Sequence, residues 1–149
     1  MIHYRPATVP DIPGMQVVRR SVTENALSNP DLVRDADYVP FLGTEGTAWI
    51  ALDGDRIVGF SIADVPGRNI WALFLFPEYE GRGIGKELHR LMMSGYFGQT
   101  KETVWLSTAF HTRAEAFYRL RGWTDKGAHN AIERRFEMTA EDWKRISDF

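Results

Sequence analysis

The first part of the chain changes from a strand pattern to a helix pattern. Ile2–Arg5 favours a short strand that ends before a proline. Apolar residues then recur at helical spacing, which predicts a helix over residues 11 to about 25. Asn29-Pro30 resembles the capped start of a second helix, and we expect Pro40 to limit how far that helix continues.

The middle of the chain has the pattern of three strands. Thr47–Leu52 and Arg56–Ala63 are separated by Asp53-Gly54, and a glycine after aspartate favours the tight turn of a hairpin. Ile70–Phe76 is apolar throughout, which is typical of a strand buried on both faces.

Helices and strands alternate in the remainder, so we expect one mixed domain over residues 1–149. The class is α/β or α+β, around a mostly antiparallel sheet. The elements expected here are a helix beginning near Gly83, a strand over Thr103–Ala109, a helix from Thr112 to Gly122, a strand over Ala131–Met138 and a short helix from Thr139 to about Ile146.

Composition and charge exclude several classes of protein. With 44% hydrophobic and 26% charged residues, the chain has the balance of a folded globular domain. The net charge of -2 gives no general attraction to nucleic acid or anionic lipid. No apolar run approaches the ~20 residues that span a membrane, and the beginning lacks the pattern of a signal peptide. We therefore expect a soluble cytoplasmic protein that binds neither nucleic acid nor a membrane.

Cysteine is absent, and His3, His89 and His129 have no metal-ligand spacing. The absence of cysteine excludes disulfides, thiolate metal sites and a cysteine nucleophile. We expect no metal cofactor.

A glycine-rich loop follows the buried strand. Gly81, Gly83 and Gly85 alternate with other residues, which lets the backbone turn tightly beside a ligand. The start of the next helix presents free amide groups, and Arg82 and Lys86 add positive charge. This combination predicts a site for a pyrophosphate group.

Two common phosphate-binding motifs do not fit this loop. A Walker loop needs glycine at the position of Glu80 and serine or threonine at that of Glu87. A dinucleotide fingerprint needs glycine at Lys86, or glycine or alanine at Leu88, depending on its starting glycine. A simple glycine-rich turn between strand and helix is the structural alternative.

The segment Pro77–Leu88 closely resembles the acetyl-coenzyme A signature of the GNAT acetyltransferases (GCN5-related N-acetyltransferases). Arg56–Phe60 is similar to the third strand of that family. Ala114–Tyr118 and the following Gly122-Trp123 are similar to a later helix and strand, so about residues 2–138 are covered. The resemblance implies a single GNAT-like domain with a mixed, mostly antiparallel sheet of about six to seven strands flanked by helices.

The resemblance also implies an enzyme that transfers acetyl from acetyl-CoA, as a cosubstrate, directly to the amine of a small molecule or peptide. Transfer would pass through a tetrahedral intermediate without an acyl-enzyme. Tyr118 occupies the position of the general acid that protonates the leaving thiolate. The residues expected to bind the cofactor are Leu73, Phe74, Leu75, Phe76, Gly81, Arg82, Gly83, Ile84, Gly85, Lys86 and Tyr118.

Two departures from the family pattern concern the cofactor site. Glu80 replaces the usual glutamine or arginine at the start of the loop, and His111 replaces an asparagine that often contacts the cofactor. A base must also accept the proton of the attacking amine. Glu24, Asp64 and His111 are candidates, and we favour Glu24 because the first helix and the loop after it shape the acceptor site in this family.

Two other functions remain as alternatives. One is a non-catalytic coenzyme A-binding sensor or interaction domain, which the departures at Glu80 and His111 favour. The other is a nucleotide-binding module that does not use coenzyme A. Dimers are common among GNAT proteins, so the resemblance also implies a homodimer.

Overall fold

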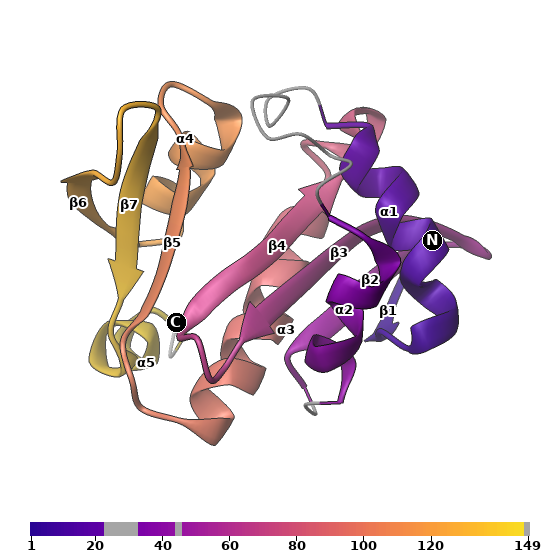
Figure 1. Cartoon of the computed structure of the whole chain (residues 1–149), viewed down its shortest axis with the longest axis horizontal. Coiled ribbons are helices and arrows are strands. Elements are labelled where there is room, and N and C mark those ends of the chain that lie inside the picture. Colours follow the sequence, from indigo (N-terminus) through magenta and orange to yellow (C-terminus); the bar gives the residue numbers. More distant parts are fainter. Residues whose placement is uncertain (23–32, 44–45, 148–149) are drawn as a thin grey trace.

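A computed structural model of the chain describes residues 1–22, 33–43 and 46–147 (Figure 1). The strands are β1 (Ile2–Pro6), β2 (Ala48–Asp53), β3 (Arg56–Asp64), β4 (Asn69–Leu75), β5 (Val104–Ala109), β6 (Thr124–Ala128) and β7 (Glu133–Met138). The helices are α1 (Ile12–Arg20), α2 (Asp35–Leu42), α3 (Ile84–Gln99), α4 (Arg113–Leu120) and α5 (Ala140–Ser147), with short 3-10 turns η1 (Val9–Asp11) and η3 (Pro77–Tyr79).

These strands form one sheet in the order β1-β2-β3-β4-β5-β7-β6. All neighbours are antiparallel except β4 and β5, which run parallel. The predicted turn at Asp53-Gly54 joins β2 to β3, and Gly54 has a φ of +62° that suits glycine. The mixed, mostly antiparallel sheet expected from the sequence is confirmed, with seven strands.

Helices cover both faces of the sheet, and β3 shows which helix lies on which face. The ring of Phe60 packs 6.0 Å from that of Tyr38 in α2, so Phe60 points toward α1 and α2. The next residue, Ser61, points the other way and donates a hydrogen bond to the backbone oxygen of Leu88 in α3 (3.1 Å). Alternation along one strand therefore separates α1 and α2 from α3 (Figure 1).

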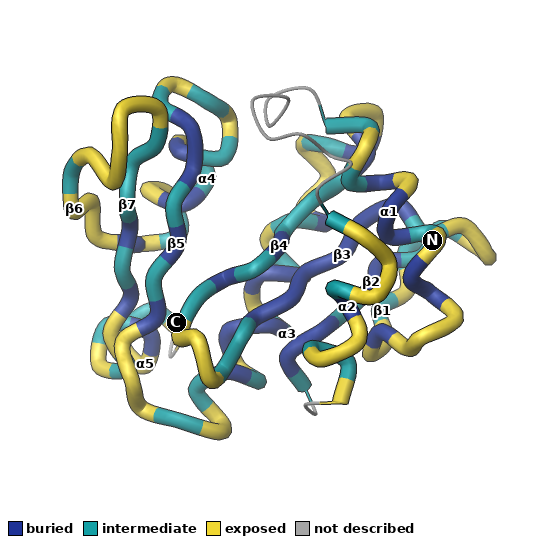
Figure 2. Tube along the Cα trace, in the orientation of Figure 1, coloured by how far each residue is buried: buried dark blue, intermediate teal, exposed yellow. Residues whose placement is uncertain are grey.

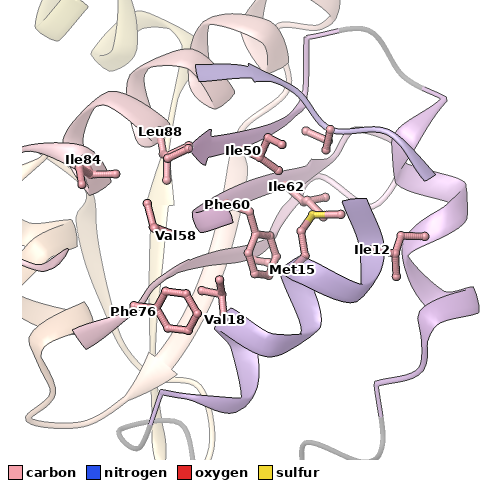
Figure 3. Packing of buried hydrophobic residues seen from close by; sticks show 14 of the residues in the cluster. Ile12, Met15, Val18, Ile50, Val58, Phe60, Ile62, Phe76, Ile84 and Leu88 are labelled. Atoms are coloured by element: carbon pink, nitrogen blue, oxygen red, sulfur yellow. The ribbon is translucent and has the colours of Figure 1, made fainter. Parts of the chain in front are cut away.

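The first hydrophobic core lies on both faces of the β2–β4 part of the sheet, against α1 on one face and the beginning of α3 on the other. Met15 and Val18 of α1 are fully buried and lie beside Phe60 and Phe76 (Figure 3). Their spacing of three residues puts both side chains on the sheet-facing side of α1. This packing holds α1 across the middle of the sheet.

The second core lies under β5 and β7, where α3, α4 and α5 meet. It contains Tyr118 of α4, Trp143 of α5 and Phe136 of β7, all buried. The outer strand β6 is mostly exposed (Figure 2). Helix α3 contributes to both cores, with Leu88 in the first and Met92 in the second.

One boundary prediction is wrong. Helix α1 ends at Arg20 rather than near residue 25, because the Ser21 hydroxyl and amide both donate to the Val18 carbonyl and close the last turn. Pro40 was expected to limit the second helix, and it lies inside α2, which ends two residues later. The predicted start at Asn29-Pro30 lies outside the described residues.

Candidate active site

Strands β4 and β5 pair at one position and then separate. Their only partners within the described residues are Asn69 and Trp105, at the beginning of both strands. Beyond this pair, the side of β4 that faces β5 has no neighbouring strand to bond with. The sheet is therefore open along the second half of β4.

Leu73 and Leu75 direct their backbone groups into this opening. The Phe76 amide donates to the Val58 carbonyl of β3 (3.0 Å), which makes Phe76 one of the residues that bond toward β3. Hydrogen-bonding direction alternates along an antiparallel strand, so Phe74 also bonds toward β3. The N–H and C=O groups of Leu73 and Leu75 face the other way and are available to a ligand.

The predicted glycine loop begins helix α3 close to this opening. Gly81 and Gly83 have φ angles of +77° and +80°, in the left-handed region that glycine adopts without strain. Gly83 is the N-cap of α3, whose first amides have no partner within the helix. A Cβ atom added at either glycine would meet no other atom within 4 Å, so both positions border open space.

A cavity of about 400 Å³ joins the opening in the sheet to this loop. Its walls come from the end of α1, strand β4, the glycine loop and α4. The lining residues are Val22, Leu73, Phe74, Leu75, Glu80, Gly81, Gly83, Gly85, Lys86, Arg113, Ala114, Ala116, Phe117, Tyr118 and Arg121. An apolar channel with unpaired backbone groups and a positively charged mouth fits a long ligand that carries phosphates at one end.

Residues 16–123 match the model of the "Acetyltransferase (GNAT) family". The chain belongs to the GNAT acetyltransferase family. None of the curated proteins shows a significant sequence match to the chain.

Solved structures of GNAT enzymes have the same fold. The chain superposes on PaiA N-acetyltransferase from Thermoplasma acidophilum in complex with coenzyme A, with a TM-score of 0.75, 15% identity, and coverage of 93% of this chain and 99% of that one. For the ribosomal-protein-S18-alanine N-acetyltransferase from Escherichia coli the TM-score is 0.71 at 15% identity, with coverage of 93% and 92%.

A third similar structure is the diaminobutyrate acetyltransferase EctA from Paenibacillus lautus, in complex with L-2,4-diaminobutyric acid and coenzyme A. Its TM-score is 0.70 at 15% identity, and the match covers 94% of this chain and 95% of that one. At this level of identity the three structures establish the GNAT fold of the chain.

Three of the residues expected to bind the cofactor do not line this cavity, because their side chains pack elsewhere. Phe76 is buried in the first core, with the Arg56 guanidinium 4.4 Å from its ring. Ile84 is 1% exposed and belongs to the same core. The Arg82 guanidinium lies 4.8 Å from the ring of Tyr79. The other predicted residues are brought together around the cavity.

Tyr118 lies on the α4 wall of the cavity and is 6% exposed. Burial raises the pKa of its phenol above the ordinary value of 10.0. Within the described residues no group hydrogen-bonds to its hydroxyl, while Phe117 and Trp123 pack edge-on against its ring at 5.3 and 5.6 Å. The side chain is therefore fixed and keeps its proton.

Charged side chains at the mouth of the cavity were missed by the sequence prediction. Arg113, at the start of α4, forms an ion pair with Glu80, which offsets the negative charge next to the glycine loop. Arg121 follows α4, and its Nε atom is the one buried side-chain polar atom without a hydrogen bond in the described chain. The sequence did not single out either arginine, because only the fold brings the two ends of α4 to the cavity.

The three candidate bases do not gather around the described walls. Glu24, the favoured candidate, lies outside the described residues. The Asp64 carboxylate accepts the Gly67 amide (3.1 Å) and stabilises the turn after β3. His111 has a φ of +60° and its amide donates to Glu115 (3.1 Å). Neither Asp64 nor His111 lines the cavity.

Within the described ranges, no group of three or more acidic or histidine side chains is arranged to hold a metal ion. In the same part of the chain, no helix is both long enough and apolar enough to cross a membrane.

Proposed function

We propose that the protein is an N-acetyltransferase that moves the acetyl group of acetyl-CoA to a primary amine. The observation that supports this most is the continuity of one cavity from the opening beside β4 to the glycine loop. Backbone groups for an extended chain, amides for phosphates and a phenol for the leaving group all border the same space. A simple glycine turn would not account for that arrangement.

The pantetheine arm would lie in the opening, as an added partner for the free backbone groups of Leu73 and Leu75. The pyrophosphate would accept hydrogen bonds from the loop amides between Gly81 and Lys86, where the positive end of the α3 dipole adds to the attraction. Arg121 would supply a charge-assisted contact to a phosphate.

In the proposed transfer, the amine nitrogen forms a bond to the acetyl carbon and the bond from that carbon to sulfur breaks. The Leu75 N–H would stabilise the negative charge that develops on the carbonyl oxygen. Tyr118 would give its proton to the departing thiolate, while the amine proton leaves to a base. The raised pKa keeps Tyr118 protonated until the thiolate forms. Because an ordinary thiol has a pKa of about 8.5, transfer of the phenol proton to the thiolate would be uphill.

A direct test combines cofactor binding with turnover. Thermal unfolding is followed with acetyl-CoA, CoA, ATP and NADH in parallel, because a ligand of the native state raises its stability. Release of free CoA is then measured with a thiol reagent on a panel of amines, and the chain contributes no thiol background because it lacks cysteine. We expect stabilisation by the two CoA species and turnover of at least one amine.

Other results would lead to a different function. Stabilisation by CoA without turnover of any amine would favour the non-catalytic sensor domain. Stabilisation by ATP alone would favour a nucleotide-binding module. A homodimer and a cytoplasmic location remain predictions from the sequence.

A further inference from the structure

A guanidinium group lies on an aromatic surface next to the cavity, on the side of β4 that faces α1 and α2. The register between β3 and β4 shifts at Trp71, which is the extra residue of a β-bulge. Arg19 of α1 lies 4.8 Å from the ring of Trp71 and 4.9 Å from that of Phe74. We refer to Arg19, Tyr38, Trp71 and Phe74 as the Arg19 cluster.

One hydrogen bond connects this guanidinium to a buried network. Arg19 Nη1 donates to the Tyr38 hydroxyl (3.4 Å), which donates in turn to Gln16 Oε1 (2.8 Å). The side-chain amide of Gln16 donates to the Val33 carbonyl (2.8 Å), so this chain of hydrogen bonds continues to the segment before α2. Tyr38 and Gln16 are both almost fully buried. The Arg19 side chain is therefore held in place before any ligand binds.

Arg19 has no acidic partner in the part of the chain that the structure describes. The nearby carboxylate of Asp35 instead accepts from Gln16 (3.3 Å). By contrast, Arg119 and Arg134 share Glu115 and Asp125 between them. A guanidinium has five N–H donors, and stacking on aromatic rings leaves the donors at its edge free for a planar anion.

The Arg19 cluster is continuous with the candidate active site. Phe74 belongs to both, because its ring lies beside Arg19 and the residue is one of those that line the cavity. Val22, whose amide donates to the Arg19 carbonyl (3.3 Å), lines the cavity as well. The ring of Phe74 lies on the α1 side of β4, whereas Leu75 on the other side contacts α3 through Gly85. A ligand held by Arg19 would thus approach β4 from the face opposite to the glycine loop.

We propose that Arg19 binds a carboxylate group of the acceptor, so that the amine acetylated by this enzyme is a free amino acid. The inference rests on the proposed acetyl transfer and names its class of substrate. A carboxylate matches the planar fork of the guanidinium and binds it through two parallel hydrogen bonds. The rings of Trp71 and Phe74 exclude water from one side of that pair, which strengthens it.

The test uses a series of amines that measures the distance from carboxylate to amine. Glycine, β-alanine, 4-aminobutyrate, 5-aminopentanoate and 6-aminohexanoate are each compared with the corresponding neutral primary amide, at saturating acetyl-CoA. We expect kcat/KM of the wild-type enzyme to favour at least one acid over its amide by about tenfold or more, as is typical of a charge-assisted bidentate contact. The preferred chain length then gives the separation between Arg19 and the reacting centre.

Variants separate recognition from a structural role. Arg19→Gln should reduce kcat/KM for the preferred acid by about tenfold or more and reduce that for its amide much less, mainly through KM. Arg19→Lys should recover part of the preference, because it keeps the charge but loses the fork. Arg20→Gln, at the exposed neighbouring position, is the matched control and should keep the preference. CoA affinity and thermal stability are measured for each variant.

Several results would overturn the assignment to Arg19. These are equal use of acids and amides by the wild type, an equal loss for both in Arg19→Gln, or binding of CoA without acceptance of any acid in the series. Preference for a peptide with an acidic first residue over every free amino acid would also overturn it. Failure to bind CoA at all would instead refute the proposed function, so the two failures are distinguishable. If Arg19→Gln does not fold, the wild-type comparison and Arg19→Lys still decide the question.

Discussion

The indole Nε1 of Trp123 donates a hydrogen bond to Nε2 of His89 over 2.9 Å, in the buried layer between α3 and the segment after α4. An imidazole that accepts at Nε2 is neutral and carries its one proton on Nδ1. The rings of Phe117 and Trp143 surround it at 5.8 and 5.7 Å. Burial, with a smaller effect of the Arg121 charge, lowers the pKa of His89 from 6.5 to about 3.

This lowered pKa predicts a loss of stability in mild acid. Between pH 6.5 and 3 the unfolded chain binds a proton on residue 89 that the folded chain does not bind. The free energy of unfolding therefore falls as the pH falls, by about 1.4 kcal/mol per pH unit from this group. Denaturant unfolding from pH 7 to pH 4.5 should show that slope in the wild type.

His89→Gln provides the comparison, because glutamine can accept from Trp123 but does not titrate. Its stability should depend less on pH, by about 1 kcal/mol per unit in the same window. His3→Gln, at an exposed position in β1, is the matched control. An unchanged slope in His89→Gln would contradict the assignment of the acid sensitivity to His89.

Gly83→Val is expected to weaken CoA binding by several-fold or more. The reason is the φ of +80°, since space for a Cβ is available and only the backbone conformation excludes valine. A branched residue in this conformation costs about 1–3 kcal/mol, so the loop shifts and its amides lose their alignment. Gly98→Val is the control, because a Cβ there also has free space but no positive φ is involved. Equal CoA affinity of both variants in calorimetry would argue against a pyrophosphate site at the glycine loop.

Tyr118→Phe is expected to lower turnover by about 10²-fold, the usual scale for loss of a general acid, with CoA affinity nearly unchanged. The buried ring keeps its packing, since phenylalanine fills the same space between Phe117 and Trp123. Because burial raises the pKa of Tyr118, wild-type turnover should not decline through ionisation of this phenol up to pH 10. Turnover of Tyr118→Phe at the wild-type rate would remove its role as the acid.

Arg121→Gln is expected to weaken CoA binding by about tenfold, which is typical of one lost charge-assisted contact to a phosphate. Arg82→Gln serves as the comparison and should cost less, because Arg82 does not line the cavity. Titration with dephospho-CoA identifies the group involved, since the effect of Arg121→Gln persists only if the pyrophosphate is the partner. A larger loss in Arg82→Gln would reverse the assignment of these two arginines.

Local patterns were enough to predict much of this fold. The Asp53-Gly54 turn and the N-cap at Thr112, whose hydroxyl accepts the Glu115 amide (3.3 Å), depend on neighbours in sequence. Most of the residues predicted to bind the cofactor line one cavity for the same reason, since strand, loop and helix follow one another directly.

The residues that sequence did not identify depend on contacts between distant segments. Arg121 reaches the glycine loop because α4 packs beside α3. The pairing of His89 with Trp123 joins positions 34 residues apart. The bulge at Trp71 arises from the register with β3, and the hydroxyl of Tyr38 bonds to Gln16, 22 residues away in sequence. Neither local propensity nor spacing contains this information.

Within the described residues, the two halves of the sheet are joined only by the pair between Asn69 and Trp105, at the beginning of β4 and β5. Helix α3 also connects the two halves, because Leu88 belongs to one core and Met92 to the other. A pantetheine chain bonded to Leu73 and Leu75 would form a reversible connection between the two halves. Cofactor binding should then slow amide hydrogen exchange not only in β4 but also in the other half of the sheet, in β5 and β7. The bound cosubstrate would thus stabilise the sheet that binds it.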